Sequence, residues 1–248
     1  MTNPQRILAA VELGRTYSIG TQEVKAVQNV NLEINTGQFV AIVGRSGSGK
    51  TTLLNLIAGL DQPTSGKVLF EEQDMAEMNE RELTEIRRNK VGFVFQSFGL
   101  LPLLSAFENV ELPLRISGVK AKEREERSWE SLDIVGLIAR AKHRPYELSG
   151  GEQQRVAIAR VLVQDPKIIV ADEPVSSLDP ARAEGVVRIL VGAAREADKA
   201  LVASIHWTQL AQRHFDRLVG LRDGLVQFDS PADRVSEKQL AGLYELTE

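Results

Sequence analysis

The stretch GRSGSGKT, residues 44–51, follows the apolar run FVAIV (39–43) and leads into TLLNLIAGL (52–60). Its spacing, a glycine, four residues and then Gly-Lys-Thr, matches the phosphate-binding loop that joins a strand to a helix. Glycines let the backbone take positive φ and approach an anion closely, so that successive NH groups can point at phosphate oxygens. An ordinary glycine-rich turn is the alternative, but every position of the motif is filled. The sequence therefore predicts a nucleotide site that contains Gly44, Arg45, Ser46, Gly47, Ser48, Gly49, Lys50, Thr51 and Thr52.

Two side chains at the end of this loop have the chemistry that a nucleotide triphosphate requires. The helix that begins near Lys50 turns the positive end of its dipole toward the loop. Lys50 can reach the β and γ phosphates, and the Thr51 hydroxyl can bind magnesium. The loop thus indicates nucleotide phosphates with Mg²⁺, but it does not decide which reaction follows.

A pair of acidic residues ends another apolar strand. KIIVADEP (167–174) contains Asp172 and Glu173, which lie beside the phosphate loop if the two strands are neighbours in one sheet. Asp172 would hold magnesium, directly or through water, and Glu173 would align or deprotonate the attacking water. Adjacent acids at a strand end are usually just solvated. Their combination with a phosphate loop favours the catalytic interpretation.

Three further side chains are candidates because of their positions. His206 closes the strand ALVASIH (200–206) and could contact the γ phosphate, since sites in open parallel sheets gather at the carboxyl ends of strands. Gln96 follows VGFVF (91–95), and its amide oxygen could join the magnesium shell. Tyr17 offers an aromatic face on which adenine could stack. The ordinary alternatives are a surface histidine, a polar residue that caps a strand and an aromatic strand residue.

A second glycine pair begins a helix about a hundred residues after the first motif. ELSGGEQQRVAIARVLV (147–163) places Ser149, Gly150 and Gly151 at a helix start, with apolar residues at helical spacing behind them. This second anion-binding helix end could complete the shell around the γ phosphate. Because it lies on a helical insertion, we expect it to serve a second copy of the chain, turned head to tail in a closed two-fold dimer. Asp179, which follows the acidic pair, could signal across the same seam.

Composition limits the class of protein. The chain has 248 residues, 43% of them apolar, which supports a substantial core. A formal net charge of -4 provides no overall basic field, so nucleic acid is not an expected partner. The absence of cysteine excludes disulfides and cysteine-ligated zinc and agrees with a reducing compartment. The start is too polar for a signal peptide, and no run approaches the roughly 20 apolar residues of a membrane span. Any membrane role is expected to come through a partner.

The pattern of apolar runs predicts an α/β fold with a mostly parallel sheet, because runs rich in Val, Ile and Phe alternate with segments of helical period. Five buried strands are expected, at QFVAIV, VGFVF, KIIVAD, ALVASI and RLVGL. Asp223-Gly224 is a hairpin signal that leads from the last of these into LVQF. The alternating stretch up to about residue 40 predicts an N-terminal antiparallel side sheet.

We expect a single domain over residues 1–248, with a core of about 1–97 and 146–248 and a helical insertion of about 98–145. The insertion contains the apolar run FGLLPLLSAF. This run is either ordinary core or a docking surface for a short helix of a membrane partner, since neither helical nor strand period accounts for all of its apolar residues. An amphipathic helix is expected at the C-terminal end.

Taken together, the motifs resemble those of one family. GRSGSGKT, FVFQ, LSGGEQQRVAIAR, IIVADEP, SLD and the histidine of ASIH, in this order, are similar to the nucleotide-binding subunit of an ATP-binding cassette (ABC) transporter. The likeness spans almost the whole chain, and LSGGEQQRVAIAR is its most specific part. It implies a P-loop NTPase core with the ABC ATPase fold, ATP and Mg²⁺ as ligands, and a homodimer that hydrolyses two ATP at shared sites.

The same resemblance implies transmembrane subunits that dock near the glutamine loop and the helical insertion. It places the protein peripherally on the cytoplasmic face of the inner (cell) membrane.

Two groups within this family are favoured by different parts of the chain. VGFVFQSFGLLPLLSAFENVELPL (91–114) and HRPYELSGGEQQRVAIAR (143–160) are similar to ATPases of the lipoprotein-release and macrolide-efflux group, which favours export or extraction. ADEPVSSLDP and DRLVGLRDGLVQFDSP resemble phosphonate-import ATPases more closely. The first group usually reads ADEPTGNLD and has an acidic residue where this chain has Trp207. The export type is therefore the first expectation, and a phosphonate-type importer is the alternative.

Two other classes of protein are alternatives to a transport subunit. Soluble ABC-type ATPases of DNA maintenance carry long coiled-coil arms or zinc modules, and this sequence has neither heptad runs of that length nor cysteine. A phosphate-loop kinase would transfer the γ phosphate to a small molecule, which gives LSGG no purpose.

Overall fold

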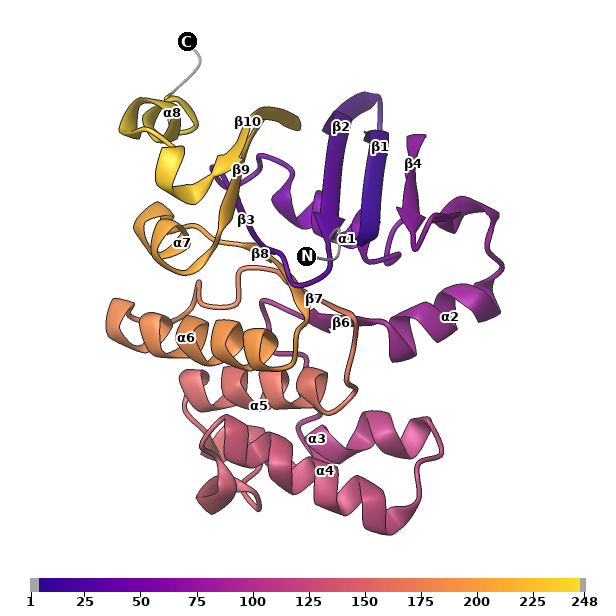
Figure 1. Ribbon diagram of the computed structural model, residues 1–248, viewed down its shortest axis with the longest axis vertical. Coiled ribbons are helices and arrows are strands. Elements are labelled where there is room, and N and C mark those ends of the chain that lie inside the picture. Colours follow the sequence, from indigo (N-terminus) through magenta and orange to yellow (C-terminus); the bar gives the residue numbers. More distant parts are fainter. Residues whose placement is uncertain (1–4, 246–248) are drawn as a thin grey trace.

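The computed structural model describes residues 5–245 and contains two β-sheets together with a set of α-helices (Figure 1). The six-stranded sheet has the order β10-β9-β3-β8-β7-β6. Its strands are β3 (Phe39–Val43), β6 (Val91–Val94), β7 (Ile168–Ala171), β8 (Ala200–Ser204), β9 (Arg217–Arg222) and β10 (Leu225–Pro231). The four-stranded sheet has the order β2-β1-β4-β5, with strands β1 (Arg6–Ile19), β2 (Gln22–Asn35), β4 (Ser65–Phe70) and β5 (Gln73–Asp74).

The α/β prediction is confirmed strand by strand in the central sheet. All five expected strands are present, and β3, β6, β7, β8 and β9 pair in parallel. The hairpin expected at Asp223-Gly224 joins β9 to the antiparallel β10. A side sheet of antiparallel strands was also expected, and β1 and β2 form its longest pair.

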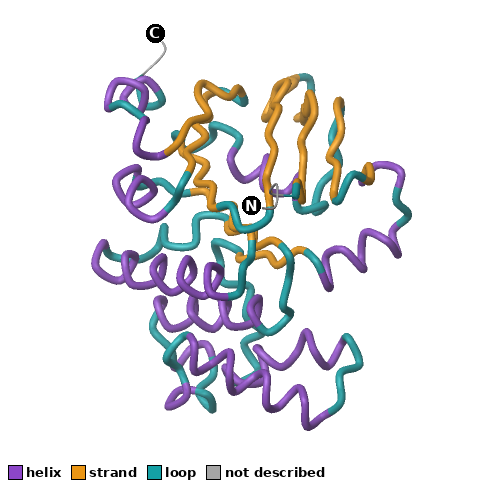
Figure 2. Tube along the Cα trace, in the orientation of Figure 1, coloured by secondary structure: helices purple, strands orange, loops and turns teal. Residues whose placement is uncertain are grey.

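The helices lie mainly on one side of the central sheet. Their bounds are α1 (Lys50–Ile57), α2 (Glu80–Asn89), α3 (Ala106–Ile116), α4 (Ala121–Ile134), α5 (Gly150–Leu162), α6 (Pro180–Glu196), α7 (Thr208–His214) and α8 (Glu237–Gly242). Short 3₁₀ turns occupy Met75–Glu77, Ile138–Arg140, Pro145–Glu147 and Ala232–Arg234. Figure 2 shows that the helices from α3 to α6 gather at one end of the molecule, away from the antiparallel strands.

Two separate hydrophobic cores fill the two faces of the central sheet, because successive strand residues point to opposite faces. On β3, Phe39, Ala41 and Val43 pack into the core beneath helices α3 to α7. Val40 and Ile42 pack into the other core, which α1 and the antiparallel sheet complete. Helix α1 therefore lies between the two sheets, and the loop before it, residues 44–49, follows the carboxyl end of β3.

Three elements were not predicted from the sequence. β4 and β5 come from SGKVLFEEQD, where few residues are apolar; β4 is held by pairing with β1, and β5 by pairing with β4. α2 comes from ERELTEIRRN, in which Ile86 is the one buried residue. A capping box between Asn79 and Glu82 stabilises its start. The predicted C-terminal helix is present only as the short α8, and residues 246–248 lie outside the described part.

A tight contact between β4 and β1 yields a stability prediction. Gly66 has φ +71, and a Cβ there would lie 2.2 Å from the carbonyl oxygen of Glu12. Gly66→Ala is expected to lower the free energy of unfolding by about 2–5 kcal/mol, since the left-handed backbone and the backbone clash both add cost. Gly185→Ala in α6 is the control, because nothing lies within 4 Å of that Cβ position. It should raise stability by about 0.5–1 kcal/mol. Urea denaturation measures both, and equal destabilisation of the two variants would contradict this account.

Candidate functional site

The loop between β3 and α1 forms a concave run of backbone at the edge of the central sheet. Gly44, Gly47 and Gly49 have φ of 156, 79 and 100 degrees, respectively. Gly49 is the N-cap of α1, and a Cβ there would lie 2.1 Å from the carbonyl oxygen of Ala26. Only glycine fits between the loop and β2 at this point. The loop therefore presents its NH groups and the N-terminus of α1 to the same space, as an anion site requires.

A cavity of about 520 Å³ opens in front of this loop. Eight of the residues predicted for the site line it, namely Ser46, Gly47, Gly49, Lys50, Thr51, Thr52, Gln96 and Glu173. The remaining wall consists of Val24, Lys25, Ala26, Gln28 and Asp223, which the sequence did not indicate. Gly44, Arg45 and Ser48 belong to the same loop but do not line the cavity.

The Lys50 side chain is only 3% exposed and lies along the inside of the loop. Its ammonium donates to the carbonyl oxygens of Gly44 and Arg45 at 3.0 and 2.9 Å and lies 3.6 Å from the Glu173 carboxylate. Burial lowers the pKa of Lys50, while the charges of Glu173 and Asp172 act in the opposite direction. The charge of Lys50 is thus held where it can meet a phosphate group with little competition from water.

Asp172 is buried, and its Oδ1 atom accepts hydrogen bonds from two hydroxyls. Thr51 Oγ1 lies at 3.1 Å and Ser204 Oγ at 2.8 Å. A carboxylate and a threonine hydroxyl in contact form an oxygen-only donor set, which is what Mg²⁺ prefers. The described residues contain no cluster of three or more His, Cys, Asp or Glu that could hold a metal alone. Because Mg²⁺ usually takes its other ligands from substrate phosphates and water, the pair fits that ion.

Glu173 is held in an uncommon backbone conformation, with φ of 41 degrees. Its NH donates to Ser204 Oγ at 2.7 Å, so that one buried serine fixes both acids. Its Oε2 accepts from the Gln96 amide at 3.3 Å, and the same amide donates to Ser176 Oγ at 3.3 Å. A strained residue that is held by its surroundings is typical of functional sites. The arrangement directs the Glu173 carboxylate into the cavity beside Lys50.

Comparison with known proteins assigns this site to a family. The profile of the ABC transporter family matches residues 27–176. The chain belongs to the ABC transporter ATP-binding family. It is 44% identical over 223 residues to an uncharacterized ABC transporter ATP-binding protein of Thermotoga maritima, with 90% of this chain and 94% of that protein covered.

Two further similarities agree with this assignment. The chain is 41% identical over 220 residues to the lipoprotein-releasing system ATP-binding protein LolD of Hyphomonas neptunium, covering 89% of this chain and 96% of LolD. Its structure is similar to the dimeric post-hydrolysis structure of the ATP-binding cassette MJ0796 bound to ADP and Pi, with a TM-score of 0.84 at 42% identity. That match covers 91% of this chain and 99% of the other. The protein is thus an ABC ATPase with the cassette fold.

His206 lies apart from the cavity of this ABC ATPase. It follows β8, as predicted, but it is exposed and does not line the cavity. Its ring meets the Tyr244 ring edge to face at a centroid distance of 6.2 Å. The Tyr244 hydroxyl donates to the His206 carbonyl oxygen at 3.2 Å, and burial raises the pKa of Tyr244. Tyr244 belongs to the segment after α8, so the C-terminal part of the chain positions His206.

The LSGGE segment also lies outside the cavity of its own chain. Ser149 is exposed and caps α5, with its NH donating to Glu152 Oε2 at 2.8 Å. Gly150 and Gly151 begin the helix, and a Cβ on Gly150 would lie 3.6 Å from Leu178. Ser149, Gly150 and Gly151 do not line the cavity in the described structure.

Asp179 lies next to Leu178 and caps α6, accepting from the Arg182 NH at 3.1 Å. The predicted seam residues Ser149, Gly150 and Asp179 therefore gather on one surface of the cassette, because Leu178 connects the starts of α5 and α6.

Tyr17 is half-buried on β1 and does not line the cavity directly. It pairs with Val24 across the antiparallel ladder, and Val24 does line the cavity. Since directly opposite residues of such a pair point to the same side of the sheet, Tyr17 lies at the border of the site.

Ser204 is the functional residue that sequence reasoning missed. It is fully buried and bonds both Asp172 and Glu173. The one available signal was its position, because it is the only hydroxyl in the apolar strand ALVAS and lies two residues before His206.

Proposed function

We propose that this ABC ATPase is the energy-supplying subunit of an exporter of the lipoprotein-release or macrolide-efflux type. It would act peripherally at the cytoplasmic face of the membrane, dimerise around two Mg-ATP and move a membrane partner. The observation that carries the proposal is the joining of Lys50, Gln96 and Glu173 around one cavity, in a chain that matches two LolD proteins over 96% of their length. Within the described residues no helix has the length and apolar character of a membrane span.

The residues of the cavity can hold ATP by its phosphates. The loop from Gly44 to Thr51 and the N-terminus of α1 would bind the β and γ phosphates, with Lys50 between them. Thr51 and Asp172 would hold Mg²⁺, with the Gln96 amide within reach of the same region. When bound, Mg²⁺ supplies charge neutralisation for the phosphate oxygens.

Hydrolysis is the direct attack of water on the γ phosphorus. Glu173 would orient that water and take its proton while the bond between the γ phosphorus and the bridging oxygen breaks, which leaves ADP and inorganic phosphate. Gln96 holds the Glu173 carboxylate from one side, and Lys50 keeps its positive charge near the phosphate that gains electron density. Ser204 fixes the backbone from which Glu173 acts.

A second copy of the chain would complete the site. The cavity is open, and Ser149 and Gly150 lie on another surface together with Asp179. Helix α5 presents an exposed N-terminus there, which suits the γ phosphate held by a partner. The similar cassette MJ0796 forms a dimer, which supports a closed pair of this chain.

A groove beside the Gln96 loop suits the membrane partner. We call it the Phe95 groove; it has a volume of about 300 Å³ and is lined by residues that include Leu60, Phe95, Gly99, Pro113 and Arg160. Phe95 is 41% exposed, and Leu101 and Leu103 in the following loop are 45% and 79% exposed. Exposed apolar side chains grouped in this way are typical of an interaction surface.

The run FGLLPLLSAF is thus divided between the two interpretations considered for it. Ala106 is buried in the core, and Leu100 and Phe107 pack against it, whereas Leu101 and Leu103 face solvent. Arg160 of α5 donates to the carbonyl oxygen of Phe98 at 3.0 Å. A displacement of the residues that line the Phe95 groove would therefore be transmitted both to Gln96, which follows Phe95, and to helix α5, which begins with the LSGGE segment.

The identity of the co-purifying membrane protein tests the proposed function. We expect a four-span protein with a large extracytoplasmic domain to co-purify with the tagged chain. Leu103→Glu should reduce this association at least tenfold, because it places a charge in an apolar contact, while the ATPase activity of the isolated subunit stays unchanged. Ile134→Glu is the matched control, since Ile134 is 54% exposed at the end of α4. A many-span permease with a solute-binding protein would instead indicate the phosphonate-type importer.

The classes outside transport have less support. The longest helix of the described structure is α6 with 17 residues, which is far shorter than the coiled-coil arm of a DNA-maintenance ATPase. A phosphate-loop kinase would have no use for the anion-binding start of α5 outside its own cavity. Such a kinase would form a phosphorylated small-molecule product. Detection of such a product would overturn the proposed function.

A further inference from the structure

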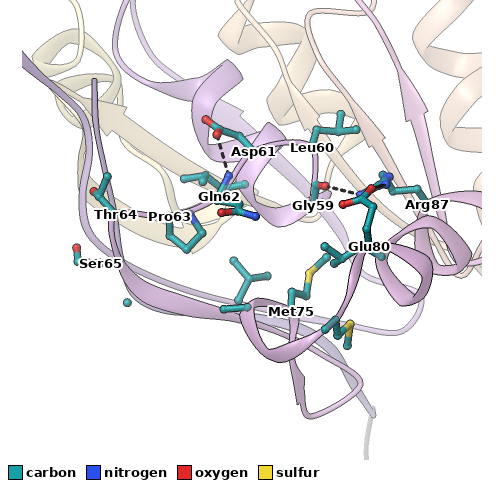
Figure 3. Close-up of a pocket in the computed structure, with 16 residues that line it drawn as sticks. Gly59, Leu60, Asp61, Gln62, Pro63, Thr64, Ser65, Met75, Glu80 and Arg87 are labelled. Carbon is teal, nitrogen blue, oxygen red and sulfur yellow. Dashed lines mark hydrogen bonds and ion pairs between the residues drawn. The ribbon is translucent and has the colours of Figure 1, made fainter. Parts of the chain in front are cut away.

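Asp61 lies in the loop that follows α1, and three donors engage its carboxylate. Oδ2 accepts the Tyr17 hydroxyl at 2.7 Å. Oδ1 accepts the backbone NH of Gln62 at 2.8 Å and lies 2.8 Å from the Arg15 guanidinium. Figure 3 shows Asp61 turned back over its own loop onto the nitrogen of Gln62. The carboxylate is thereby held by two side chains of β1 and by the backbone of its own loop.

Arg15 completes the arrangement around Tyr17. Its guanidinium lies over the Tyr17 ring, 4.6 Å from the centroid. The Arg15 Nε atom is buried and has no hydrogen-bond partner among residues 5–245, and Asp61 and the ring are the groups seen to hold this side chain in place. Arg15 and Asp61 side chains are each 23% exposed, so the ion pair is shielded more than a surface pair. The hydroxyl and one face of Tyr17 are therefore already occupied.

The same loop connects Tyr17 to the phosphate-binding helix. The NH groups of Leu60 and Asp61 both donate to the Asn55 carbonyl oxygen in the last turn of α1, at 2.9 and 3.3 Å. Thr64 then returns the loop to β1, with its NH donating to the Gly14 carbonyl oxygen at 2.8 Å. Helix α1 thus begins at the phosphate loop, and its last turn is bonded to Asp61, the residue that holds Tyr17.

Hydrogen bonds fix this loop because there is little packing beneath it. A cavity of about 450 Å³ is lined by residues 59–66 on one side and by side chains that include Met75 on the other (Figure 3); Leu83 also lines it. The bonds from Asp61 to Tyr17 and Arg15 connect the loop to β1. Loss of the Asp61 carboxylate would remove the acceptor of the Tyr17 hydroxyl and the ion-pair partner of Arg15.

We propose that Asp61 is a positioning residue for the nucleotide base. It rests on the proposed role of Tyr17 as the surface on which adenine stacks. With Arg15 on one face of the ring, adenine must use the opposite face, at the border of the cavity that Val24 lines. Asp61 fixes the ring in this orientation before ATP arrives, so binding does not have to order it. Ordering one side chain on binding corresponds to about a 2- to 12-fold loss of affinity.

Equilibrium binding of two ligands to the full chain tests this proposal. Asp61→Ala is expected to raise the Kd of Mg-ATP about 2- to 12-fold and to leave the Kd of inorganic tripolyphosphate, which has no base, unchanged. Tyr17→Ala should raise the Kd of ATP by about 5- to 150-fold, the range measured for base–aromatic stacking. The double variant should be no weaker than Tyr17→Ala, since Asp61 acts through the ring. The maximal hydrolysis rate at saturating ATP should not change in Asp61→Ala.

Two more variants separate positioning from stability. Asp61→Asn keeps an oxygen that can accept the Tyr17 hydroxyl and should restore most of the affinity for ATP. Glu72→Ala removes a carboxylate that bonds Arg6 on the same strand β1, and it should leave the Kd of ATP unchanged.

Several results would overturn the inference. They are an unchanged Kd of ATP in Asp61→Ala, an equal loss of affinity for ATP and tripolyphosphate, and additive effects of Asp61→Ala and Tyr17→Ala. If Tyr17→Ala binds ATP normally, adenine does not stack on Tyr17, and the proposed role of Asp61 is then wrong as well. The proposed transport function is tested separately by the co-purifying partner, so the two failures can be told apart.

Discussion

Replacing Glu173 with glutamine is expected to slow ATP hydrolysis by about 10²- to 10⁴-fold while ATP binding is retained. The reason is specific to the carboxylate. Glutamine has nearly the same shape and can still meet Gln96, which lies 3.3 Å from Glu173 Oε2, but it cannot take a proton from water. Binding should persist because Lys50 keeps both carbonyl contacts within the phosphate loop. With the base removed, ATP should accumulate uncleaved, and the ATP-bound dimer should accumulate with it.

Single-turnover phosphate release and sedimentation with Mg-ATP measure the two halves of this prediction. Glu125→Gln is a suitable control, since Glu125 is an exposed carboxylate on α4 that does not line the cavity. It should hydrolyse ATP at the normal rate and show no stable dimer. Normal turnover in Glu173→Gln would remove Glu173 from the role of base. A loss of ATP binding would show instead that the ion pair with Lys50 organises the phosphate loop.

The central sheet could be predicted from the sequence because its strands are buried on both faces. FVAIV, IIVA and ALVAS are continuous apolar runs, which a parallel sheet between two cores requires. Strand order was not predicted, and the strands of the phosphate loop and the acidic pair are not direct neighbours, because β8 lies between β3 and β7. The antiparallel strands β4 and β5 were missed because SGKVLFEEQD carries no strong pattern, and their stability depends on pairing of β4 with β1 and of β5 with β4.

The phosphate loop and the acidic pair were predictable for a similar reason. Their chemistry depends on residues that are adjacent in the chain, and the structure brings Thr51 to 3.1 Å from Asp172 and Lys50 to 3.6 Å from Glu173. Contacts between distant segments that belong to no motif were not predictable. Ser204 and Asp61 act through contacts with residues tens of positions away, and no local spacing signals them.

The position of His206 illustrates the same limit. Its place after β8 was clear from the apolar strand. Its edge-to-face contact with Tyr244 could not be predicted, because Tyr244 follows α8, 38 residues further along the chain. A role of His206 at the γ phosphate is a proposal, since its side chain does not line the cavity in the described structure.

Ser149→Arg is expected to abolish ATP-dependent dimerisation while each chain still binds ATP. The arginine would replace the small, exposed Ser149 at the start of α5 with a long charged side chain on the surface proposed to meet the partner. ATP binding should persist because Ser149 does not line the cavity of its own chain. Hydrolysis should fall to a small residual rate, since the γ phosphate would lack the helix end supplied by the partner.

The variant also removes a helix cap, and this effect must be separated from the loss of the interface. Substitution of an N-cap serine costs about 0.5–2 kcal/mol of stability. Ser105 provides a matched control because it caps α3 through the same capping box, with its NH donating to Glu108 Oε2 at 2.8 Å, as the Ser149 NH donates to Glu152. Ser105→Arg should therefore lower stability by a similar amount and leave ATP-dependent dimerisation intact.

Sedimentation with Mg-ATP, carried out in the Glu173→Gln background, gives the decisive comparison. We expect a dimer for Glu173→Gln alone and for its combination with Ser105→Arg, and a monomer for its combination with Ser149→Arg. If the Ser149→Arg combination sediments as a dimer, the start of α5 does not meet a partner's phosphate. If that variant is monomeric yet hydrolyses ATP at the full rate when Glu173 is present, one chain holds a complete site, and the exposed position of Ser149 outside the cavity has another cause.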